Sequence, residues 1–370
     1  REKRIVSKTF GGIRSRGLPQ VTKRTFSFKM GEIDIYFNAA LSLVKSAGNL
    51  ITEHVTGCKV FENKSCDIDL VTEIDKKVEE TLIGGLSKQF PDHKFIGEES
   101  VAGGAKCELT DAPTWIIDPV DGTLNFVHGF PHSCISVGLT INKESVAGII
   151  YNPILQQLFT AKKGQGAFLN DRQIHVSDCT ELRKALVAFE AGTSRDEEKC
   201  KVVFENYKRI VTKGHGLRAL GSAALNMAMV AMGGADANFE FGIHAWDIAA
   251  GDILVREAGG VCIDPSGKPL DLLSRRVLCT STPQLAQELV DTLFSTQCYE
   301  LIRNTFIIIR FFKTILYTYM IGIVTRTDLG ALTMSCTVVN FIIKCLCANL
   351  SSLLYSLRLR IGAVAYNQLL

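Results

Sequence analysis

Apolar residues recur along the chain at two spacings, one typical of helices and the other typical of strands. Residues 31–51 carry apolar side chains at helical spacing, which predicts one long amphipathic helix that packs by this face. A second helix is predicted after Thr72, because threonine is a favourable N-cap residue and apolar positions recur from 78 to 86. Pro91 ends that helix, and residues 94–96 form a strand-like run.

Strand patterns dominate the middle of the chain. The runs 134–141, 146–151, 157–161 and 166–170 are spaced by turn-like pairs such as Asn142-Lys143, which predicts antiparallel hairpins and not a parallel βαβ repeat. Helices and strands alternate in the second half. Strands are expected at 186–189, 217–220, 235–239, 261–263 and 277–279, and helices at 196–211, 224–232, 246–258 and 283–294.

The most informative stretch is Trp115-Ile116-Ile117-Asp118-Pro119-Val120-Asp121-Gly122-Thr123, a buried strand pattern that ends in a turn rich in carboxylates. Two carboxylates three residues apart at a strand end would lie close together, and like charges at that distance are costly unless a cation lies between them. Oxygen ligands alone favour a hard ion such as Mg²⁺ over zinc. The alternative is an Asp-Pro/Asp-Gly turn whose side chains cap their own backbone.

Two other segments place acidic residues after similar patterns. Gly97-Glu98-Glu99-Ser100 follows an apolar pair, and Trp246-Asp247 opens a helical pattern that ends at Gly259-Gly260. In this order the three segments resemble the inositol monophosphatase family, whose signatures are D-P-x-D-G-[ST] after a strand and a later W-D-x-[AC]-[GSA] before a glycine pair. The resemblance covers residues 32 to 296 or so. It implies an α+β fold, a layered αβαβα sandwich of the inositol monophosphatase and fructose-bisphosphatase type.

The resemblance also implies a metal site and catalytic residues. Glu98, Asp118 and the carbonyl of Val120 would hold a first Mg²⁺, and Asp118 would bridge to a second that Asp121 and Asp247 complete, with two or three ions in each active site. Thr123 and Glu98 would orient the attacking water, supported by Asp75, and Lys64 falls where the family has a functional lysine. Asp75 also lies in the first turn of a helix, where the helix dipole favours a carboxylate in any case. Inhibition by Li⁺ and a homodimer are further expectations from the family.

Substrate contacts divide into a phosphate end and a polyol end. Gly122 and Thr123 begin a predicted helix, whose free N–H groups suit a phosphate. By resemblance the substrate-binding set is Glu98, Val120, Asp121, Gly122, Thr123, Gly221, Ser222, Ala223, Glu240 and Asp247. A carboxylate such as Glu240 can accept hydrogen bonds from vicinal hydroxyls. As alternatives, residues 221–223 permit close packing and Glu240 is a surface acid. His244 is expected to be a packing residue, and no serine-hydrolase triad is recognisable.

Charge and cysteine usage narrow the possible partners. The net charge of the 370 residues is +3, but residues 31–297 contain 25 Lys and Arg against 35 Asp and Glu, a net charge of −10. An acidic body does not suit nucleic-acid binding. The twelve cysteines form no CxxC pair and no zinc-spaced cluster, which indicates reduced thiols in an intracellular protein. A cytoplasmic location is therefore expected.

Three regions are predicted: a basic extension at 1–30, a catalytic domain at 31–297 and a hydrophobic tail at 298–370. The extension is expected to be disordered, with a mitochondrial transit peptide as the alternative because it is rich in arginine and poor in acidic residues. The apolar runs 305–324 and 331–354 of the tail contain Arg310, Lys313 and Lys344, which argues against a membrane hairpin although membrane association stays an alternative.

The sequence therefore predicts a Mg²⁺-dependent phosphatase that hydrolyses myo-inositol monophosphate to inositol and phosphate and serves phosphatidylinositol metabolism. Metal ions clamped by carboxylates can activate water and neutralise phosphoryl charge, so no protein nucleophile is needed. One alternative is a related lithium-sensitive sugar or nucleotide phosphatase. Another is a non-catalytic dimeric scaffold, and a divalent-cation buffer is disfavoured because nothing resembles an EF-hand loop.

Overall fold

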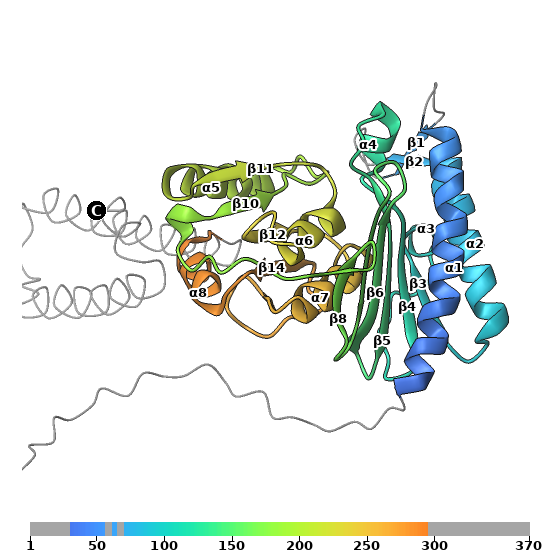
Figure 1. Ribbon diagram of the computed structural model, residues 1–370. Coiled ribbons are helices and arrows are strands. Elements are labelled where there is room, and N and C mark those ends of the chain that lie inside the picture. The colour runs from blue at the N-terminus through green and yellow to red at the C-terminus, as the bar shows by residue number, and fades with distance from the viewer. Residues whose placement is uncertain (1–29, 56–60, 65–69, 295–370) are drawn as a thin grey trace, which may run out of the picture.

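Two main β-sheets, with helices between them and on their outer sides, and a separate two-stranded sheet form the computed structural model of the protein (Figure 1). It describes residues 30–55, 61–64 and 70–294. The larger sheet has seven strands in the order β3-β4-β5-β6-β7-β8-β9, and the smaller has five in the order β11-β10-β12-β14-β13. The layers alternate as helix, sheet, helix, sheet, helix. The predicted α+β sandwich is therefore confirmed.

Eight α-helices, one short 3-10 helix (Leu182–Lys184) and fourteen strands make up the regular structure of the described residues. The strands are β1 (Phe61–Asn63), β2 (Leu70–Thr72), β3 (Lys94–Gly97), β4 (Thr114–Asp121), β5 (Cys134–Ile141), β6 (Glu144–Asn152), β7 (Gln157–Lys162), β8 (Gly166–Leu169), β9 (Arg172–Ile174), β10 (Leu186–Phe189), β11 (Gly216–Arg218), β12 (Ala237–Phe241), β13 (Val261–Ile263) and β14 (Arg276–Thr280). The helices are α1 (Met30–His54), α2 (Glu73–Gln89), α3 (Glu98–Ala102), α4 (Thr123–His128), α5 (Glu197–Lys213), α6 (Ala223–Ala231), α7 (Ala245–Glu257) and α8 (Pro283–Thr292).

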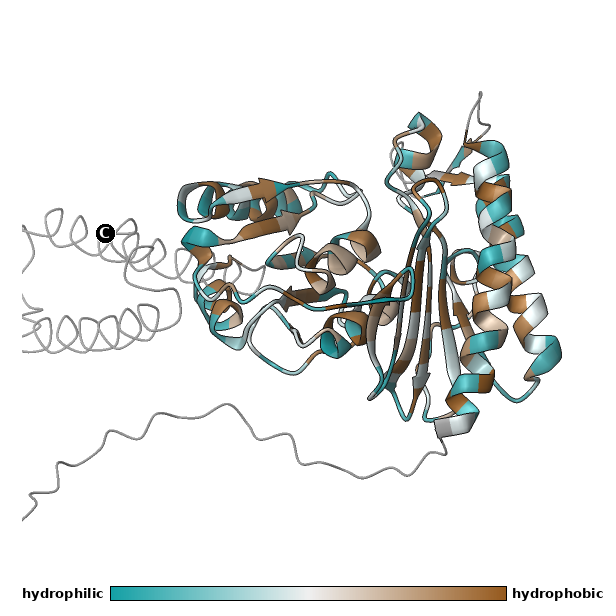
Figure 2. Ribbon diagram, in the orientation of Figure 1, coloured by the Kyte–Doolittle hydropathy of each residue, from teal (hydrophilic) through white to brown (hydrophobic). Residues whose placement is uncertain are grey.

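Helices α1 and α2 cover the outer face of the larger sheet (Figure 1). The apolar positions that predicted α1 face inward, and Val44, Ala47 and Ile51 are fully buried. Figure 2 shows the strands of this sheet mainly in brown, whereas α1 carries both brown and teal positions. Helix α2 begins at the predicted cap, because the Thr72 hydroxyl accepts from the backbone N–H groups of Ile74 and Asp75.

Helices α6 and α7 form the middle layer, and α7 lies directly on the larger sheet. Two glycines make this contact possible, because Gly138 of β5 and Gly148 of β6 are paired directly across the two strands. A Cβ atom on Gly138 would lie 2.7 Å from Ala249 Cβ, and one on Gly148 would lie 2.7 Å from the carbonyl oxygen of Ala250. The absent side chains therefore set how closely α7 approaches the sheet.

The smaller sheet combines two kinds of pairing. Strand β10 pairs in parallel with β11 and β12, whereas β14 pairs antiparallel with β12 and β13. Its outer face packs against α5 and α8 through a separate apolar cluster that includes Phe239, Ile210 and Leu289. Because β10 and β12 run in the same direction, the residues that follow them, Glu190 and Gly242, lie at one edge of the sheet.

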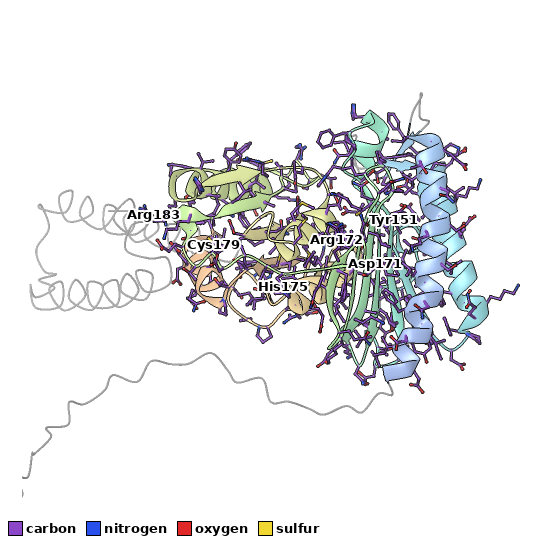
Figure 3. The ribbon with its side chains drawn as sticks, viewed as in Figure 1. Tyr151, Asp171, Arg172, His175, Cys179 and Arg183 are labelled. Atoms are coloured by element: carbon purple, nitrogen blue, oxygen red, sulfur yellow. The ribbon has the colours of Figure 1, made fainter. Side chains whose placement is uncertain are left out.

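A long segment links the two sheets. Figure 3 labels Asp171, His175, Cys179 and Arg183 along it, from the edge of the larger sheet to the outer side of the smaller one. The Val176 amide donates to the carbonyl of Ala258 at 3.1 Å, and the Thr282 hydroxyl donates to the carbonyl of Cys179 at 2.7 Å. These bonds fix the segment to the end of α7 and the start of α8.

Most predicted elements are present, and the differences are local. The antiparallel hairpins from 134 to 170 are confirmed, and the sheet gains a further short strand, β9, that the pattern did not reveal. Helix α3 was also not predicted. The strand expected at 235–239 lies at Ala237–Phe241, so Glu240 is inside the strand and not at its end.

The predictions for the two ends of the chain concern residues outside the described ranges. Residues 1–29 and 295–370 are among those not described, so the expected extension and tail stay predictions. Within residues 30–55, 61–64 and 70–294, no helix combines the length and the apolar character needed to cross a membrane.

Substitution of Gly148 by Ala should destabilise the fold, because the new methyl group would also lie 2.6 Å from Ile253 Cγ2. Overpacking of this kind costs about 1–3 kcal/mol, so the midpoint of urea unfolding in EDTA should fall. Gly84→Ala is the matched control, since no atom lies within 4 Å of its added Cβ in helix α2. Alanine is favoured over glycine inside a helix by about 1 kcal/mol, so the control should be stabilised. Equal effects of both substitutions would contradict this account of the α7 contact.

Candidate active site

Three aspartates from two distant segments bring their carboxyl groups together. One oxygen from each of Asp118, Asp121 and Asp247 lies within 4.8 Å of the others. Asp118 and Asp121 belong to β4, and Asp247 lies in the first turn of α7. These three carboxyl groups converge as expected from the sequence, although Asp247 is more than 120 positions from the other two aspartates along the chain.

A local irregularity in β4 allows two of these aspartates to share one site. Residues three apart on a regular strand point to opposite faces of the sheet. The pairing of β4 with β5 shifts register between Asp118 and Asp121, where Pro119 interrupts the ladder. Both side chains are buried, and the Asp118 carboxylate accepts a hydrogen bond from the Val120 amide at 3.0 Å.

Glu98 reaches the same cluster from the neighbouring strand. Strand β3 runs parallel to β4 with Gly97 opposite Ile117, so Glu98, the first residue of α3, lies beside Asp118 of β4. The charges of Glu98, Asp121 and Asp247 all act on Asp118. Asp118 is therefore the central member of the four acids.

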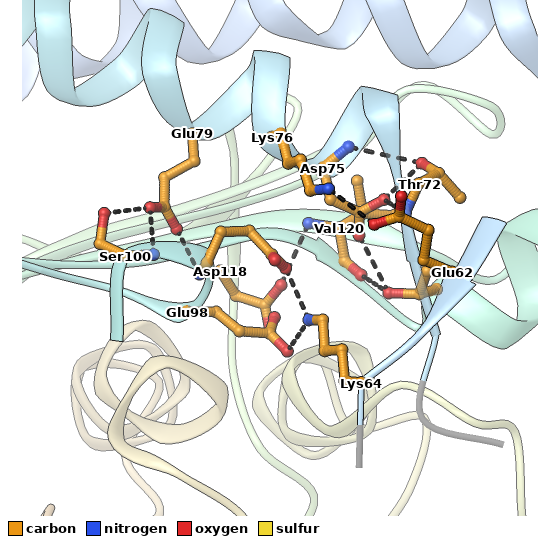
Figure 4. A network of polar contacts seen from close by, with 12 residues as sticks. Glu62, Lys64, Thr72, Asp75, Lys76, Glu79, Glu98, Ser100, Asp118 and Val120 are labelled. Carbon is orange, nitrogen blue, oxygen red and sulfur yellow. Dashed lines mark hydrogen bonds and ion pairs between the residues drawn. The ribbon is translucent and has the colours of Figure 1, made fainter. Parts of the chain in front are cut away.

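Lys64 is the cation that contacts this group of acids in the described structure (Figure 4). Its ammonium nitrogen lies 2.8 Å from Glu98 Oε1 and 2.6 Å from Glu99 Oε1. Burial lowers the pKa of Lys64, but the two carboxylates outweigh that effect and raise it above its usual value. The sequence placed Lys64 at a functional position, and its contact with Glu98 is consistent with that placement.

The acids are unfavourable as charged groups without a cation. Burial raises the pKa of Asp118 well above its usual range, and three neighbouring carboxylates raise it further. Burial also raises the pKa of Asp247 well above its usual range, followed by the charges of Asp121 and Glu98. The donor set consists of oxygens alone and carries a high negative charge. These residues fit a hard divalent cation, because such an ion offsets the repulsion that burial makes severe.

A second network surrounds Asp75 and Thr123. The Thr123 hydroxyl lies 3.1 Å from Asp75 Oδ1 and 2.9 Å from the carbonyl oxygen of Val120, and its single proton can serve one of them at a time. Asp75 is fully buried, and its other oxygen accepts from the Thr72 amide at 2.9 Å and from the Thr72 hydroxyl. Burial raises the pKa of Asp75 to about 6, although the bonds from Thr72 oppose the shift.

The phosphate end of the predicted site has the geometry that a short turn requires. Gly122 precedes α4 with φ of 86°, a left-handed conformation that favours glycine. A Cβ atom there would also lie 2.9 Å from the carbonyl oxygen of His132 and 3.0 Å from that of Gly221. Gly122 therefore allows the chain to turn, and its missing side chain allows the backbone at Gly221 to approach closely.

The predicted polyol end is arranged differently from what the sequence suggested. The Ser222 hydroxyl donates to Asp121 Oδ2 at 2.6 Å, and the amides of Ala223 and Ala224 donate to the same carboxylate at 3.3 and 2.7 Å. Asp121 therefore caps the N-terminus of α6. Because residues 222 and 223 bind Asp121, they tie the 221–223 segment to the acidic cluster. Their contact with substrate stays a prediction.

Glu240 is buried and not the surface acid of the alternative interpretation. Its Oε1 lies 3.5 Å from Asn226 Nδ2, which also donates to Glu190 at 2.9 Å. Burial raises the pKa of Glu240 well above its usual range, with a further contribution from the charge of Glu190. Glu190 accepts from the Gly221 amide at 2.9 Å, so the two acids and the 221 segment form one polar group.

Glu79 is a positioning residue that the sequence reasoning missed. It lies on the inward face of α2, four residues after Asp75, and its carboxylate accepts from the amides of Glu99 and Ser100 at 2.8 Å each. These bonds satisfy the first N–H groups of α3 and fix the residue next to them, Glu98 (Figure 4). An acid in the middle of an otherwise apolar helix face was the available signal.

His244 packs as the sequence suggested. Its ring stacks on Trp246 with centroids 4.4 Å apart, and its backbone amide donates to Asp247 Oδ2 at 2.6 Å. It therefore orients Asp247 through the main chain.

Comparison with known proteins was made once this geometry was established. The family model described as "Inositol monophosphatase family" matches residues 33–297. Inositol monophosphatase 1 of Bos taurus is 46% identical over 251 residues, which cover 68% of this chain and 91% of that protein. Inositol monophosphatase 2 of Rattus norvegicus is 45% identical over 258 residues, covering 70% and 89%. The solved inositol monophosphatase from Anabaena superposes with a TM-score of 0.62 at 32% identity, covering 70% of this chain and 96% of that one.

Substitution of Asp118 by Asn should stabilise the protein in EDTA, because it removes the central charge from the cluster while the new side-chain oxygen can still accept from the Val120 amide. A gain of about 1 kcal/mol would raise Tm by roughly 2–4 °C for a domain of this size. The wild-type protein in EDTA should lose stability as pH rises, because the raised pKa values of these carboxyls make the folded state bind more protons than the unfolded state.

Stabilisation by Mg²⁺ should be seen in the wild type and be lost in Asp118→Asn. Asp178→Asn is the control, since Asp178 is exposed. A lower Tm for Asp118→Asn in EDTA, with the control unchanged, would contradict the repulsion described here.

Proposed function

Because the chain belongs to the inositol monophosphatase family and is therefore a phosphatase that hydrolyses phosphate monoesters, we propose that it converts myo-inositol monophosphate to inositol and phosphate with Mg²⁺. The observation that carries the proposal is the cluster of Glu98, Asp118, Asp121 and Asp247, four acids gathered from three segments. Without a cation, burial of these four acids would destabilise the fold, because the free energy of desolvation and of charge repulsion would not be offset.

The proposed metal ligands are those that the resemblance to the family implies. Glu98, Asp118 and the carbonyl of Val120 would hold one Mg²⁺, and Asp118, Asp121 and Asp247 would hold a second. Bound cations of this kind lower the pKa of a coordinated water and neutralise charge on the phosphoryl oxygens. The spacing of the three aspartates supports a shared site, since their oxygens lie within 4.8 Å of one another.

Thr123 and Asp75 are proposed to position the attacking water. The Thr123 hydroxyl can donate to Asp75 and accept from a water on its other side, so Asp75 receives a proton through it. Asp75 has a pKa of about 6 because it is buried, so it is ionised and able to accept a proton at neutral pH. Glu98 would accept from the same water, and Lys64 would keep Glu98 in place.

The remaining residues are proposed to bind substrate. The N–H groups at Gly122 and Thr123 would receive the phosphate together with the cations. Residues 221–223 and Glu240 would face the inositol ring, where a buried carboxylate suits vicinal hydroxyls. A sugar or nucleotide phosphate is the second candidate substrate. Inhibition by Li⁺, a homodimer and a cytoplasmic location are part of the same proposal, and they rest on the resemblance and the composition.

Phosphate release by the full-length chain from myo-inositol 1-phosphate should require Mg²⁺ and be lost on adding EDTA. Sugar phosphates and 2′- and 3′-nucleotides form the comparison panel. Asp118→Asn should reduce kcat by at least ~10³-fold while the protein stays folded, as judged by circular dichroism, because the central ligand is removed. No release from any compound by the wild type would reject the proposed function, and full activity of Asp118→Asn would remove Asp118 from the site.

Thr123→Val should lower kcat by about 10²–10⁴-fold, the range typical of lost general-base assistance, because valine keeps the shape of threonine but has no hydroxyl. Thr123→Ser retains the hydroxyl and should keep most of the activity. The wild-type rate should fall as pH drops below about 6, where Asp75 becomes protonated. Equal rates for the Val and Ser variants would contradict the assigned role.

A further inference from the structure

Three basic side chains gather at the edge of the smaller sheet where β10 and β12 end. They are Arg195, Lys199 and Arg275, and each of the two arginines carries a charge that acts on Lys199. Arg195 donates to the carbonyl of Gly192 at 2.9 Å, and Arg275 donates to that of Gly242 at 2.8 Å. Arg275 Nη2 also lies 3.0 Å from His244 Nε2, and among the described residues neither arginine forms an ion pair with a carboxylate.

Lys199 differs from the arginines because no described residue accepts a hydrogen bond or forms an ion pair with its ammonium group. The acids of its own helix have other partners: Asp196 caps α5 by accepting from the amides of residues 198 and 199, and Glu197 pairs with Lys201 at 2.6 Å. The ammonium group is only partly exposed, and burial lowers the pKa of Lys199.

Two glycines make room for this ammonium group. A Cβ atom on Gly192 would lie 2.6 Å from Lys199 Nζ, and one on Gly242 would lie 3.0 Å from it. Gly192 follows β10 and Gly242 follows β12, so the lysine reaches from α5 into the space between the two strand ends. A side chain at either position would displace it.

The ammonium group is close to the proposed substrate site. Gly242 directly follows the last residues of β12, which include Glu240, and the charge of Glu240 acts on Lys199. Gly242 is also two residues before His244, whose amide holds Asp247. Lys199 therefore lies near Glu240, at the proposed polyol end of the site.

We propose that Lys199 is a specificity-determining residue that binds a second anionic group, a carboxylate or phosphate, at the far end of the substrate. The inference rests on the proposed function, because it extends the same site past the residues assigned to the inositol ring. An ammonium group that has no acceptor among the described residues, and on which two nearby arginines act, is suited to a charge-assisted hydrogen bond with an anion. Substrates with a neutral far end would not use this contact.

A second explanation is that Lys199 only compensates the charge of Glu240. The two explanations differ in what a neutral lysine replacement does. Loss of a contact to a distant anionic group weakens binding of doubly anionic ligands alone and leaves the chemical step unchanged. Loss of compensation for Glu240 would weaken every ligand whose hydroxyls reach Glu240.

The test compares two ligands that differ only at the far end, glucose 1-phosphate and glucuronic acid 1-phosphate. Each is measured as a competitive inhibitor of myo-inositol 1-phosphate hydrolysis by the full-length protein with Mg²⁺. The wild type should bind the glucuronic acid compound about tenfold more tightly, the size expected for one charge-assisted contact. This preference should shrink as NaCl is raised from 50 to 500 mM, because screening weakens a partly exposed contact.

Lys199→Gln should abolish the preference while its kcat and KM for myo-inositol 1-phosphate stay within about twofold of the wild type. Lys199→Arg should retain the preference, and Lys201→Gln, on the same helix, is the control and should not alter it. Equal binding of the two ligands by the wild type would overturn the inference. It would also be overturned if Lys199→Gln weakened both ligands and the substrate alike. Failure of the wild type to hydrolyse myo-inositol 1-phosphate would reject the proposed function itself.

Discussion

Mutual repulsion among buried carboxylates is the constraint on which the rest of this structure depends. Burial raises the pKa of Glu98, Asp118, Asp121 and Asp247, and the charges of the other three acids raise that of Asp118 further. A fold keeps such a group only if the surrounding packing holds it in place. The layers of helices and sheets serve this purpose, because they place the ends of β4, α3 and α7 at one point.

Several secondary contacts maintain that arrangement. The paired glycines Gly138 and Gly148 let α7 rest on the larger sheet, which fixes the height of Asp247 above it. Glu79 fixes α3 and hence Glu98. Asp121 holds the N-terminus of α6 through three hydrogen bonds, so the same carboxylate links the acidic cluster to the segment proposed to bind substrate. The contacts of Glu79 and Asp121 are hydrogen bonds, and those at Gly138 and Gly148 are close packing.

The sequence predicted the fold class and the acids of the site because both leave local patterns. Apolar periodicity identified α1, the hairpins from 134 to 170 and α7, and the strand followed by paired aspartates identified Asp118 and Asp121. What it could not predict depends on contacts between distant segments. Three features depend on a segment that lies far away in the sequence. They are the bonds of Glu79 to α3, the bond of Ser222 to Asp121, and the position of Glu240 inside β12. Lys199 was missed for the same reason, since the glycines that accommodate it are 7 and 43 residues away.

The bond from the Ser222 hydroxyl to Asp121 joins residues 101 positions apart and connects one sheet to the helix layer beneath it. The acidic cluster forms only when β4 and α7 come together, because β4 supplies Asp118 and Asp121 and α7 supplies Asp247. The Ser222 hydroxyl likewise finds its acceptor only when β4 is in place. Contacts of such long sequence separation form late in folding, because closing the intervening loop costs chain entropy before the new contacts contribute favourable free energy. During refolding, helical signal should therefore return well before the ability to turn over substrate, and a partly folded chain would be inert towards phosphate esters.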